Sequence, residues 1–178
     1  MMASLVDRML RAAKLDANLY EEVEADKGSM GQAITVVVIS SVAGGIGSIK
    51  LLGITGLLFG TIFALVGWFI WAFLVYLIGT KLLPEPQTKS DIGELLRTIG
   101  FSSSPGVIRV LGLITFLSGI VSIIADVWML VAMVIAVRQA LDYKSTWRAI
   151  GVCVIGYVIV LIVVYGLIFG ALGLSPPF

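Results

Sequence analysis

The chain has 178 residues, of which 59% are hydrophobic and 13% are charged, and its formal net charge is +1. A mean hydropathy of +1.08 excludes an ordinary soluble domain, and the near-zero net charge argues against a nucleic-acid-binding surface. The absence of histidine excludes His-based zinc sites and Ser-His-Asp triads, and a single cysteine excludes an internal disulfide.

The first 30 residues are rich in charge and lack an apolar core, so we expect a cytoplasmic segment rather than a secretory signal. Apolar residues at helical spacing from Leu5 to Ala13 predict a short amphipathic helix. Two positions are open for it: the cytoplasmic membrane surface, or a site against the protein's own cytoplasmic loops. The spacing of Asn18 and Glu21 predicts a capping box at the start of the following acidic stretch.

Two apolar segments come next, and we expect spans over about 31–49 and 51–78, joined by a very short outer loop at Lys50. Gly56 and Gly60 lie four residues apart in the second span, as do Gly166 and Gly170 near the end of the chain. Small residues at this spacing let helix backbones approach closely. These four glycines are therefore predicted to pack helices together, within the chain or between copies.

The chain becomes polar again between Lys81 and Ser104. Within this stretch we predict an interfacial amphipathic helix over 90–100, lying half in the cytoplasmic leaflet. Asp91 is its predicted N-cap and Glu94 falls in its first turn.

Residues 107–137 form an apolar stretch that is too long for one span, because a helix of this length measures about 46 Å against a hydrocarbon core of about 30 Å. We therefore predict a hairpin of two short spans, 105–124 and 126–140, which turns between Ser118 and Asp126. A fifth span is expected over 148–172.

The distribution of basic residues orients these spans. With five spans, eleven of the twelve Lys and Arg residues fall on one side of the membrane, and only Lys50 falls on the other. The positive-inside rule then places the N-terminus in the cytoplasm and the C-terminus outside. The predicted fold is all-α: a cytoplasmic segment, 1–30, and a membrane domain, 31–178, with five transmembrane helices and two cytoplasmic amphipathic helices in total.

The stretch Gly100-Phe101-Ser102-Ser103-Ser104-Pro105 resembles the Gly-Tyr-x-x-x-Pro signature of the Yip-one (Ypt/Rab-interacting protein) domain family, with Phe in place of Tyr. The segments 95–143 and 19–26 are similar to the bacterial branch of that family. The resemblance implies a five-span protein of the bacterial cytoplasmic (inner) membrane. Eukaryotic members carry an Asp-Leu-Tyr-Gly-Pro motif and longer N-termini implicated in binding Rab-type GTPases. This chain lacks that motif, so Rab binding is not carried over to it.

Within the signature, Gly100, Phe101 and Pro105 are predicted to form a hinge between the in-plane helix and the next span. Gly100 suits a left-handed C-cap that ends the first helix. Ser103 or Ser104 suits the N-cap of the second helix, and Pro105 suits its first turn.

Three arginines lie near the predicted cytoplasmic boundary: Arg97, Arg109 and Arg138. One interpretation of Arg109 and Arg138 is anchoring, because long basic side chains reach the headgroups from one turn inside the membrane. The sharper hypothesis is that all three form a site for anionic lipid headgroups. Asp126 is expected at the outer turn of the hairpin.

These features favour a non-enzymatic membrane-organising or adaptor protein. It would have membrane lipids, further copies of itself or other membrane proteins as partners, and no nucleic acid, metal or cofactor. The alternative is a small transporter or lipid-moving protein that acts as an oligomer, since five spans contain no inverted repeat. An enzyme is disfavoured because no nucleophile has a base beside it in the sequence.

Overall fold

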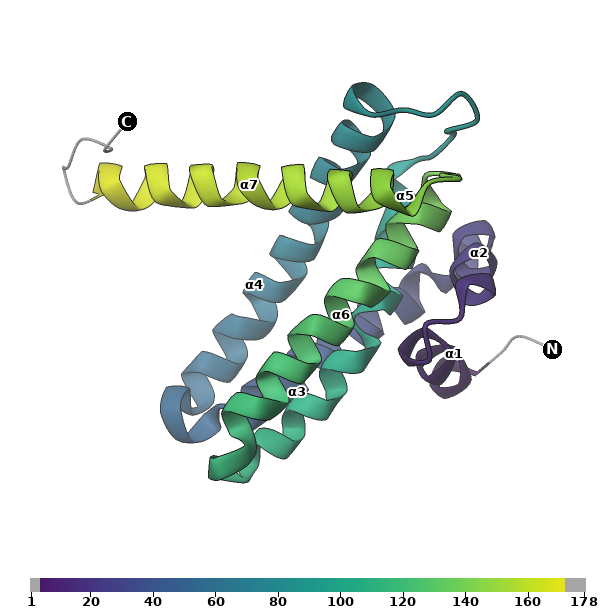
Figure 1. The fold of residues 1–178 in the computed structure, drawn as a ribbon. Coiled ribbons are helices and arrows are strands. Elements are labelled where there is room, and N and C mark those ends of the chain that lie inside the picture. Colours follow the sequence, from purple (N-terminus) through teal and green to yellow (C-terminus); the bar gives the residue numbers. More distant parts are fainter. Residues whose placement is uncertain (1–3, 172–178) are drawn as a thin grey trace.

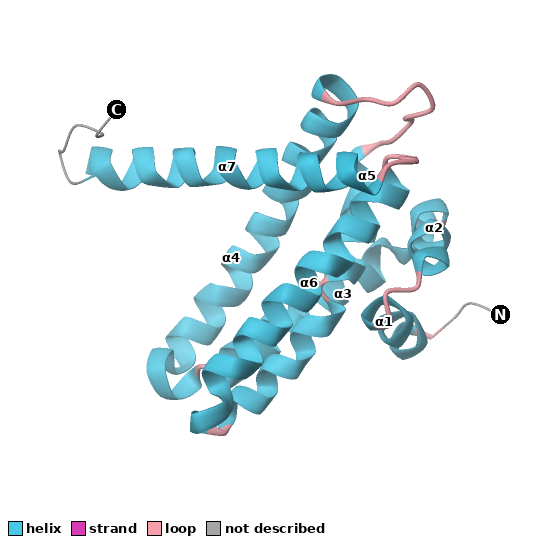
Figure 2. Cartoon of the chain, viewed as in Figure 1, coloured by secondary structure: helices cyan, strands magenta, loops and turns pink. Residues whose placement is uncertain are grey.

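The computed structural model describes residues 4–171, which form helices joined by short loops and, within that range, no strand (Figure 1, Figure 2). This confirms the predicted all-α class. The elements in chain order are α1 (Leu5–Ala13), α2 (Ala17–Ala25), the 3₁₀ helix η1 (Lys27–Ser29), α3 (Met30–Gly47), α4 (Ile49–Leu77), the π-helix η2 (Ile78–Leu82), α5 (Ile92–Ser102), the 3₁₀ helices η3 (Ser104–Leu113) and η4 (Thr115–Leu117), α6 (Ser118–Ala140) and α7 (Thr146–Ala171).

In the described part of the chain, four helical stretches are long and apolar enough to cross a membrane: Lys27–Gly47, Ile49–Leu82, Ser118–Ala140 and Thr146–Leu167. They cover the predicted first, second, fourth and fifth spans. The predicted third span, 105–124, is not among them. The membrane bundle is therefore confirmed with four such helices, whereas the count of five and the orientation stay predictions.

The turns between the long helices lie at two ends of the molecule (Figure 1). At one end, here called the Lys50 end, the α3–α4 turn meets the end of η3, and Lys50 Nζ donates to the Leu113 carbonyl at 3.3 Å. At the other, the α2 end, α2 lies against α5 and α6. Helix α7 begins at the α2 end, directly after the end of α6, and crosses α4 rather than running alongside it (Figure 1).

Helix α1 packs some of its apolar side chains against the rest of the protein and exposes others. Leu5 and Met9 pack against a buried core cluster, whereas Val6 and Leu10 are 64% and 56% exposed. Trp128 Nε1 of α6 donates to the Ala13 carbonyl at 2.7 Å, which fixes the end of α1 to the bundle. One side of α1 therefore packs on the protein, as one of the two interpretations predicted. The other side is exposed, and its contact with a membrane surface stays a prediction.

The predicted capping box at Asn18 is wrong. Asp16 is the N-cap of α2, and its side chain accepts a hydrogen bond from the Asn18 backbone N–H at 3.0 Å. The helix begins two residues earlier than the spacing predicted because Leu15, at φ 62°, turns the chain before Asp16. The predicted cap of α5 is confirmed, since Asp91 and Glu94 form a reciprocal capping box.

Helix α5 is not an in-plane helix half in the leaflet. Eight consecutive residues, 95–102, are buried, and α2, α3, α4 and α6 surround them. An amphipathic pattern marks one apolar face, but here neighbouring helices cover the polar face as well. Helix α5 is therefore a central element of the core.

The hairpin is also placed differently from its prediction. The chain turns at residues 114–117, before Ser118, and α6 continues as one helix of 23 residues through Asp126. The preceding segment, η3, is a 3₁₀ helix and lies backbone to backbone against α3: a Cβ on Gly47 would lie 2.1 Å from the Arg109 carbonyl oxygen. A Cβ on Gly112 would lie 3.1 Å from the Gly47 carbonyl oxygen. This close approach leaves no room for side chains on those faces.

Candidate functional site

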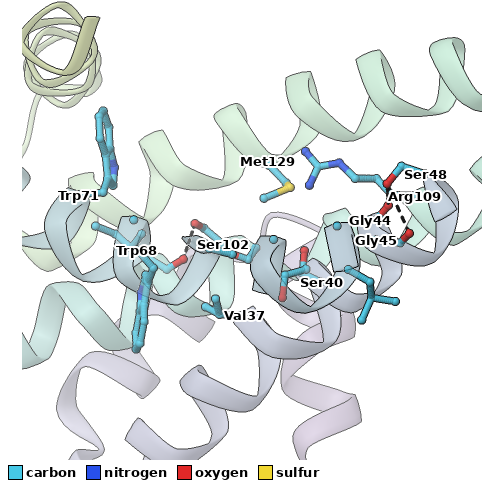
Figure 3. A pocket seen from close by; sticks show the side chains of 18 of the residues that line it. Val37, Ser40, Gly44, Gly45, Ser48, Trp68, Trp71, Ser102, Arg109 and Met129 are labelled. Atoms are coloured by element: carbon cyan, nitrogen blue, oxygen red, sulfur yellow. Dashed lines mark hydrogen bonds between the residues drawn. The ribbon is translucent and has the colours of Figure 1, made fainter. Parts of the chain in front are cut away.

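A groove with a volume of about 440 Å³ lies between α3, α4, η3 and α6 (Figure 3). It extends from Arg109, near the Lys50 end, to Trp68 and Trp71 on α4. One wall is built from small residues of α3 and α4, and the other carries Met129 and Met133 of α6. The small residues of the first wall include Gly44, Gly45, Gly56, Gly60, Ala64 and Gly67.

Two of the four predicted packing glycines line this groove. A Cβ added to Gly60 would meet no atom within 4 Å, and the atoms nearest to one added to Gly56 belong to Leu52 of the same helix. Gly166 of α7 also has open space around it, and the side chains near Gly170 lie outside the described residues. Gly60 and Gly166 therefore have open space beside them within the chain, and a packing role between copies stays a prediction.

Three of the five serines that line the groove use their protons within their own helices. Ser41 donates to the Val38 carbonyl at 2.9 Å, Ser48 to the Gly44 carbonyl at 2.9 Å and Ser102 to the Ile99 carbonyl at 2.7 Å. A hydroxyl that bonds a carbonyl one turn back no longer needs a polar partner from outside. The serine-containing walls are therefore compatible with an apolar occupant.

Arg109 supplies the charge at one end of the groove. Its Nη2 donates to the carboxylate of Asp126 on α6, and the two side chains are 26% and 63% exposed. A Cβ on Gly44, near the end of α3, would lie 3.5 Å from Arg109 Cδ. Arg109 thus lies toward the Lys50 end and not one turn inside the predicted cytoplasmic boundary.

Two tryptophans close the opposite end of the groove. Trp68 Nε1 donates to the Leu96 carbonyl of α5 at 3.1 Å. Among the described residues, Trp71 Nε1 is the buried side-chain nitrogen that has no hydrogen-bond acceptor. The Trp71 ring packs against α7, where a Cβ on Gly156 would lie 3.1 Å from its Cη2.

The three arginines of the lipid hypothesis are not brought together. Arg97 is 4% exposed, and its guanidinium donates to the carbonyls of Val23, at 2.9 Å, and Glu24. Arg138 Nε donates to the Tyr143 carbonyl at 3.2 Å and so closes the turn after α6. Arg97 and Arg138 thus lie at the α2 end, and of the three arginines only Arg109 lines the groove.

The signature residues have structural roles. Gly100 does not end α5: the helix continues to Ser102, and a Cβ on Gly100 would lie 2.9 Å from the Ala33 Cβ. Phe101 is fully buried against α1, α2, α3 and α6. Pro105 lies in the first turn of η3 as predicted, but the serine cap does not form, because Ser104 Oγ donates backward to the Phe101 carbonyl.

Sequence reasoning missed the importance of Arg8. This side chain is 4% exposed, and it donates to Glu22 at 3.0 Å, Asp26 at 2.9 Å and Gln32 at 3.0 Å. It thereby joins α1 to α2 and α3. The acidic run from Glu21 to Asp26, which follows the basic residues of α1 after one turn, was the available signal.

The carboxylates of α2 respond to different surroundings. The hydrogen bond from Arg11 holds the pKa of Glu22 below its usual value, and that from Arg8 does the same for Asp26. Glu24 is different: burial, followed by repulsion from Asp142, Glu94 and Glu21, raises its pKa to about 7.

Glu24 lines a hollow of about 670 Å³ at the α2 end, together with Glu21, Glu94 and Asp142. The hollow is bounded by α2, α5 and the turn between α6 and α7. Its lining consists of Glu21, Glu24, Ala25, Glu94, Arg138, Gln139, Asp142, Tyr143 and Lys144. The described residues contain no cluster of three or more His, Cys, Asp or Glu side chains that could hold a metal ion.

Comparison with known proteins gives one family match. The family model described as the Yip1 domain matches residues 18–169, which is most of the chain. No curated protein and no solved structure matches. The match includes the groove, the signature residues and α2.

Proposed function

The chain belongs to the Yip1 domain family, and from that premise we propose that it is a non-enzymatic adaptor that presents a folded docking platform at the membrane. The platform consists of α2 and the turn between α6 and α7. We place it on the cytoplasmic side of a bacterial inner membrane, following the excess of basic residues at that end.

The observation that carries the proposal is the way α2 is built into the membrane bundle. Leu19, Tyr20 and Val23 have no exposed surface, and the buried Arg97 of α5 binds the carbonyls at the end of the helix. A rigid platform loses little conformational freedom when a partner binds, which favours affinity. The acidic hollow beside α2 supplies the face on which a partner would dock.

The test is photo-crosslinking of the full-length protein in native membranes, with mass-spectrometric identification of the captured proteins. Deletion of residues 1–30 is unsuitable because it would remove part of the core. Glu21→Lys changes an exposed acid in the lining of the hollow, and Asp7→Lys changes an exposed acid on α1 outside it. We expect captured partners to decrease several-fold with Glu21→Lys and to persist with Asp7→Lys. Identical capture by both variants and the wild type would contradict the adaptor function.

The groove favours a second candidate, a lipid-moving protein that acts as an oligomer. Its apolar walls and its single arginine offer a route for a lipid along α4. Reconstitution into vesicles containing a fluorescent phospholipid, with chemical quenching of the outer leaflet, measures this activity. Transfer no faster than in protein-free vesicles would eliminate this candidate and would not affect the adaptor proposal.

A further inference from the structure

We propose that the groove holds one zwitterionic phospholipid, with its phosphate at Arg109, its ammonium group at Asp126 and one acyl chain along the glycine-rich wall of α4. The inference concerns a site separate from the docking platform. It therefore goes beyond the adaptor function and does not depend on it.

Most of the groove is lined by apolar side chains and glycine. The hydroxyls of Ser41, Ser48 and Ser102 are bonded within their own helices, and apart from its serines and its one arginine the groove has walls of apolar side chains and glycine. The helices that flank it expose large apolar side chains, such as Phe63 at 70% and Val127 at 57%. A trough in such surroundings opens to lipid, and hydrocarbon is the occupant that matches its largely apolar walls.

The groove is long enough for one acyl chain. From Gly56 to Trp71 the groove follows α4 for 15 residues, or about 22 Å at 1.5 Å per residue. The hydrocarbon of one leaflet is about 15 Å deep, half of the roughly 30 Å core. A single acyl chain therefore fits within the groove, and the glycines provide the width because they carry no side chain.

The charged pair of Arg109 and Asp126 lies near the Lys50 end of the bundle. Arg109 lies four residues before Leu113, which is about 8 Å at the 3₁₀ rise of roughly 2 Å per residue. Leu113 contacts Lys50 at the end of the bundle. The guanidinium is thus close enough to that end to reach the headgroup layer, as long basic side chains do.

The charges of Arg109 and Asp126 are complementary to those of a zwitterionic headgroup. Arg109 and Asp126 form a pair with no net charge, and Asp126 accepts from Nη2, which leaves the Nη1 and Nε donors for an anion. A phosphate bound to this guanidinium brings a second negative charge near Asp126. An ammonium group carried by the same lipid neutralises that repulsion. The pair therefore favours a zwitterionic headgroup over an anionic one.

The acyl-chain site is tested with a matched pair of substitutions, Gly60→Phe and Gly166→Phe. A Cβ at either position has open space within the chain, but only Gly60 faces the groove. The purified full-length protein is incubated with mixed micelles of phosphatidylethanolamine and phosphatidylglycerol, and retained lipid is counted by native mass spectrometry. We expect one tightly retained phospholipid in the wild type and in Gly166→Phe, and at least tenfold less in Gly60→Phe. Equal retention by both variants would overturn the proposal.

The headgroup site is tested in the same experiment with Asp126→Asn and Arg109→Gln. We expect the wild type to prefer phosphatidylethanolamine, Asp126→Asn to shift the preference toward phosphatidylglycerol, and Arg109→Gln to retain several-fold less of both. An unchanged preference in Asp126→Asn would overturn the assignment. If Arg109→Gln does not fold, Asp126→Asn still decides the question, because an asparagine of similar size removes only the charge. Partner capture through Glu21 is unaffected by either variant, so the two proposals fail separately.

Discussion

Arg8 is a buried charged residue that holds three helices together through its side-chain contacts. Its three side-chain contacts hold α1, α2 and α3 together, and the carboxylates of Glu22 and Asp26 are themselves 35% and 28% exposed. Breaking a buried ion pair from one side leaves the other charge uncompensated. The cost depends on how far water can reach the remaining carboxylates.

We therefore predict that Arg8→Gln lowers the free energy of unfolding by about 1.5–3 kcal/mol, the range for hydrogen bonds to charged groups. Thermal unfolding in detergent measures this change. Lys14→Gln removes an exposed positive charge near the same helix and is expected to stay within about 0.5 kcal/mol of the wild type. Equal stability of the two variants would show that the Arg8 contacts contribute little.

Glu24 gives a second prediction at the residue scale, on pH dependence. Its pKa of about 7 exceeds the ordinary value of 4.5, so between these values the folded state binds the proton more tightly than the unfolded state. Stability contributed by this group is therefore full below pH 4.5 and decreases as the pH rises to about 7. Glu22 and Asp26, whose pKa values are lowered, act in the opposite direction at more acidic pH.

Glu24→Gln is expected to remove the decrease between pH 4.5 and 7 and to be the more stable protein at pH 8. The difference should be about 1 kcal/mol, since the carboxyl is only half buried and solvent screens its interactions. Unfolding temperatures measured from pH 4 to pH 8 would reveal this difference. Parallel profiles for the two proteins would contradict the assignment of the transition to Glu24.

At the scale of elements, close backbone contact between α3 and α5 explains the glycine of the family signature. A Cβ on Gly100 would lie 2.9 Å from the Ala33 Cβ and 3.2 Å from the Ala33 carbonyl oxygen, so the helices would have to separate. Gly100→Val is expected to destabilise the protein by about 1–3 kcal/mol through overpacking. Gly60→Val introduces the same side chain into open space and is expected to be neutral or slightly stabilising. Chemical unfolding of both variants tests the difference, and a destabilised Gly60→Val would mean that the groove is filled by protein.

At the scale of the whole molecule, the turn between η3 and α6 lies at the same end as the α3–α4 turn. In a Cys153→Ala background, Gly119→Cys and Lys50→Cys should react with a membrane-impermeant thiol reagent from the same side. Lys89→Cys, in the loop between η2 and α5, should react from the other side. Labelling of whole cells and inverted vesicles measures this topology. Reaction of Gly119→Cys and Lys89→Cys from one side would contradict the arrangement.

Local patterns predicted several features of this fold correctly. The length of the apolar segments indicated the membrane helices, and the spacing of Asp91 and Glu94 indicated the capping box, because both depend on interactions within a few residues. The hairpin turn was predicted between Ser118 and Asp126 from segment length and flanking charge, which do not show that Asp126 has a partner inside the bundle. Its partner, Arg109, lies 17 residues away and becomes apparent only when η3 lies beside α6.

The sequence by itself determined the membrane class, the all-helical composition and the absence of histidine chemistry, since these follow from residue types and segment lengths. Tertiary structure alone decided that α5 is a buried core helix, that Arg97 binds backbone carbonyls and that Arg109 stands at the end of a groove. The physical reason is that lipid and protein interior are similarly apolar. An apolar helix face, or a glycine on it, therefore has the same appearance in the sequence whether a helix, a lipid or open space lies against it.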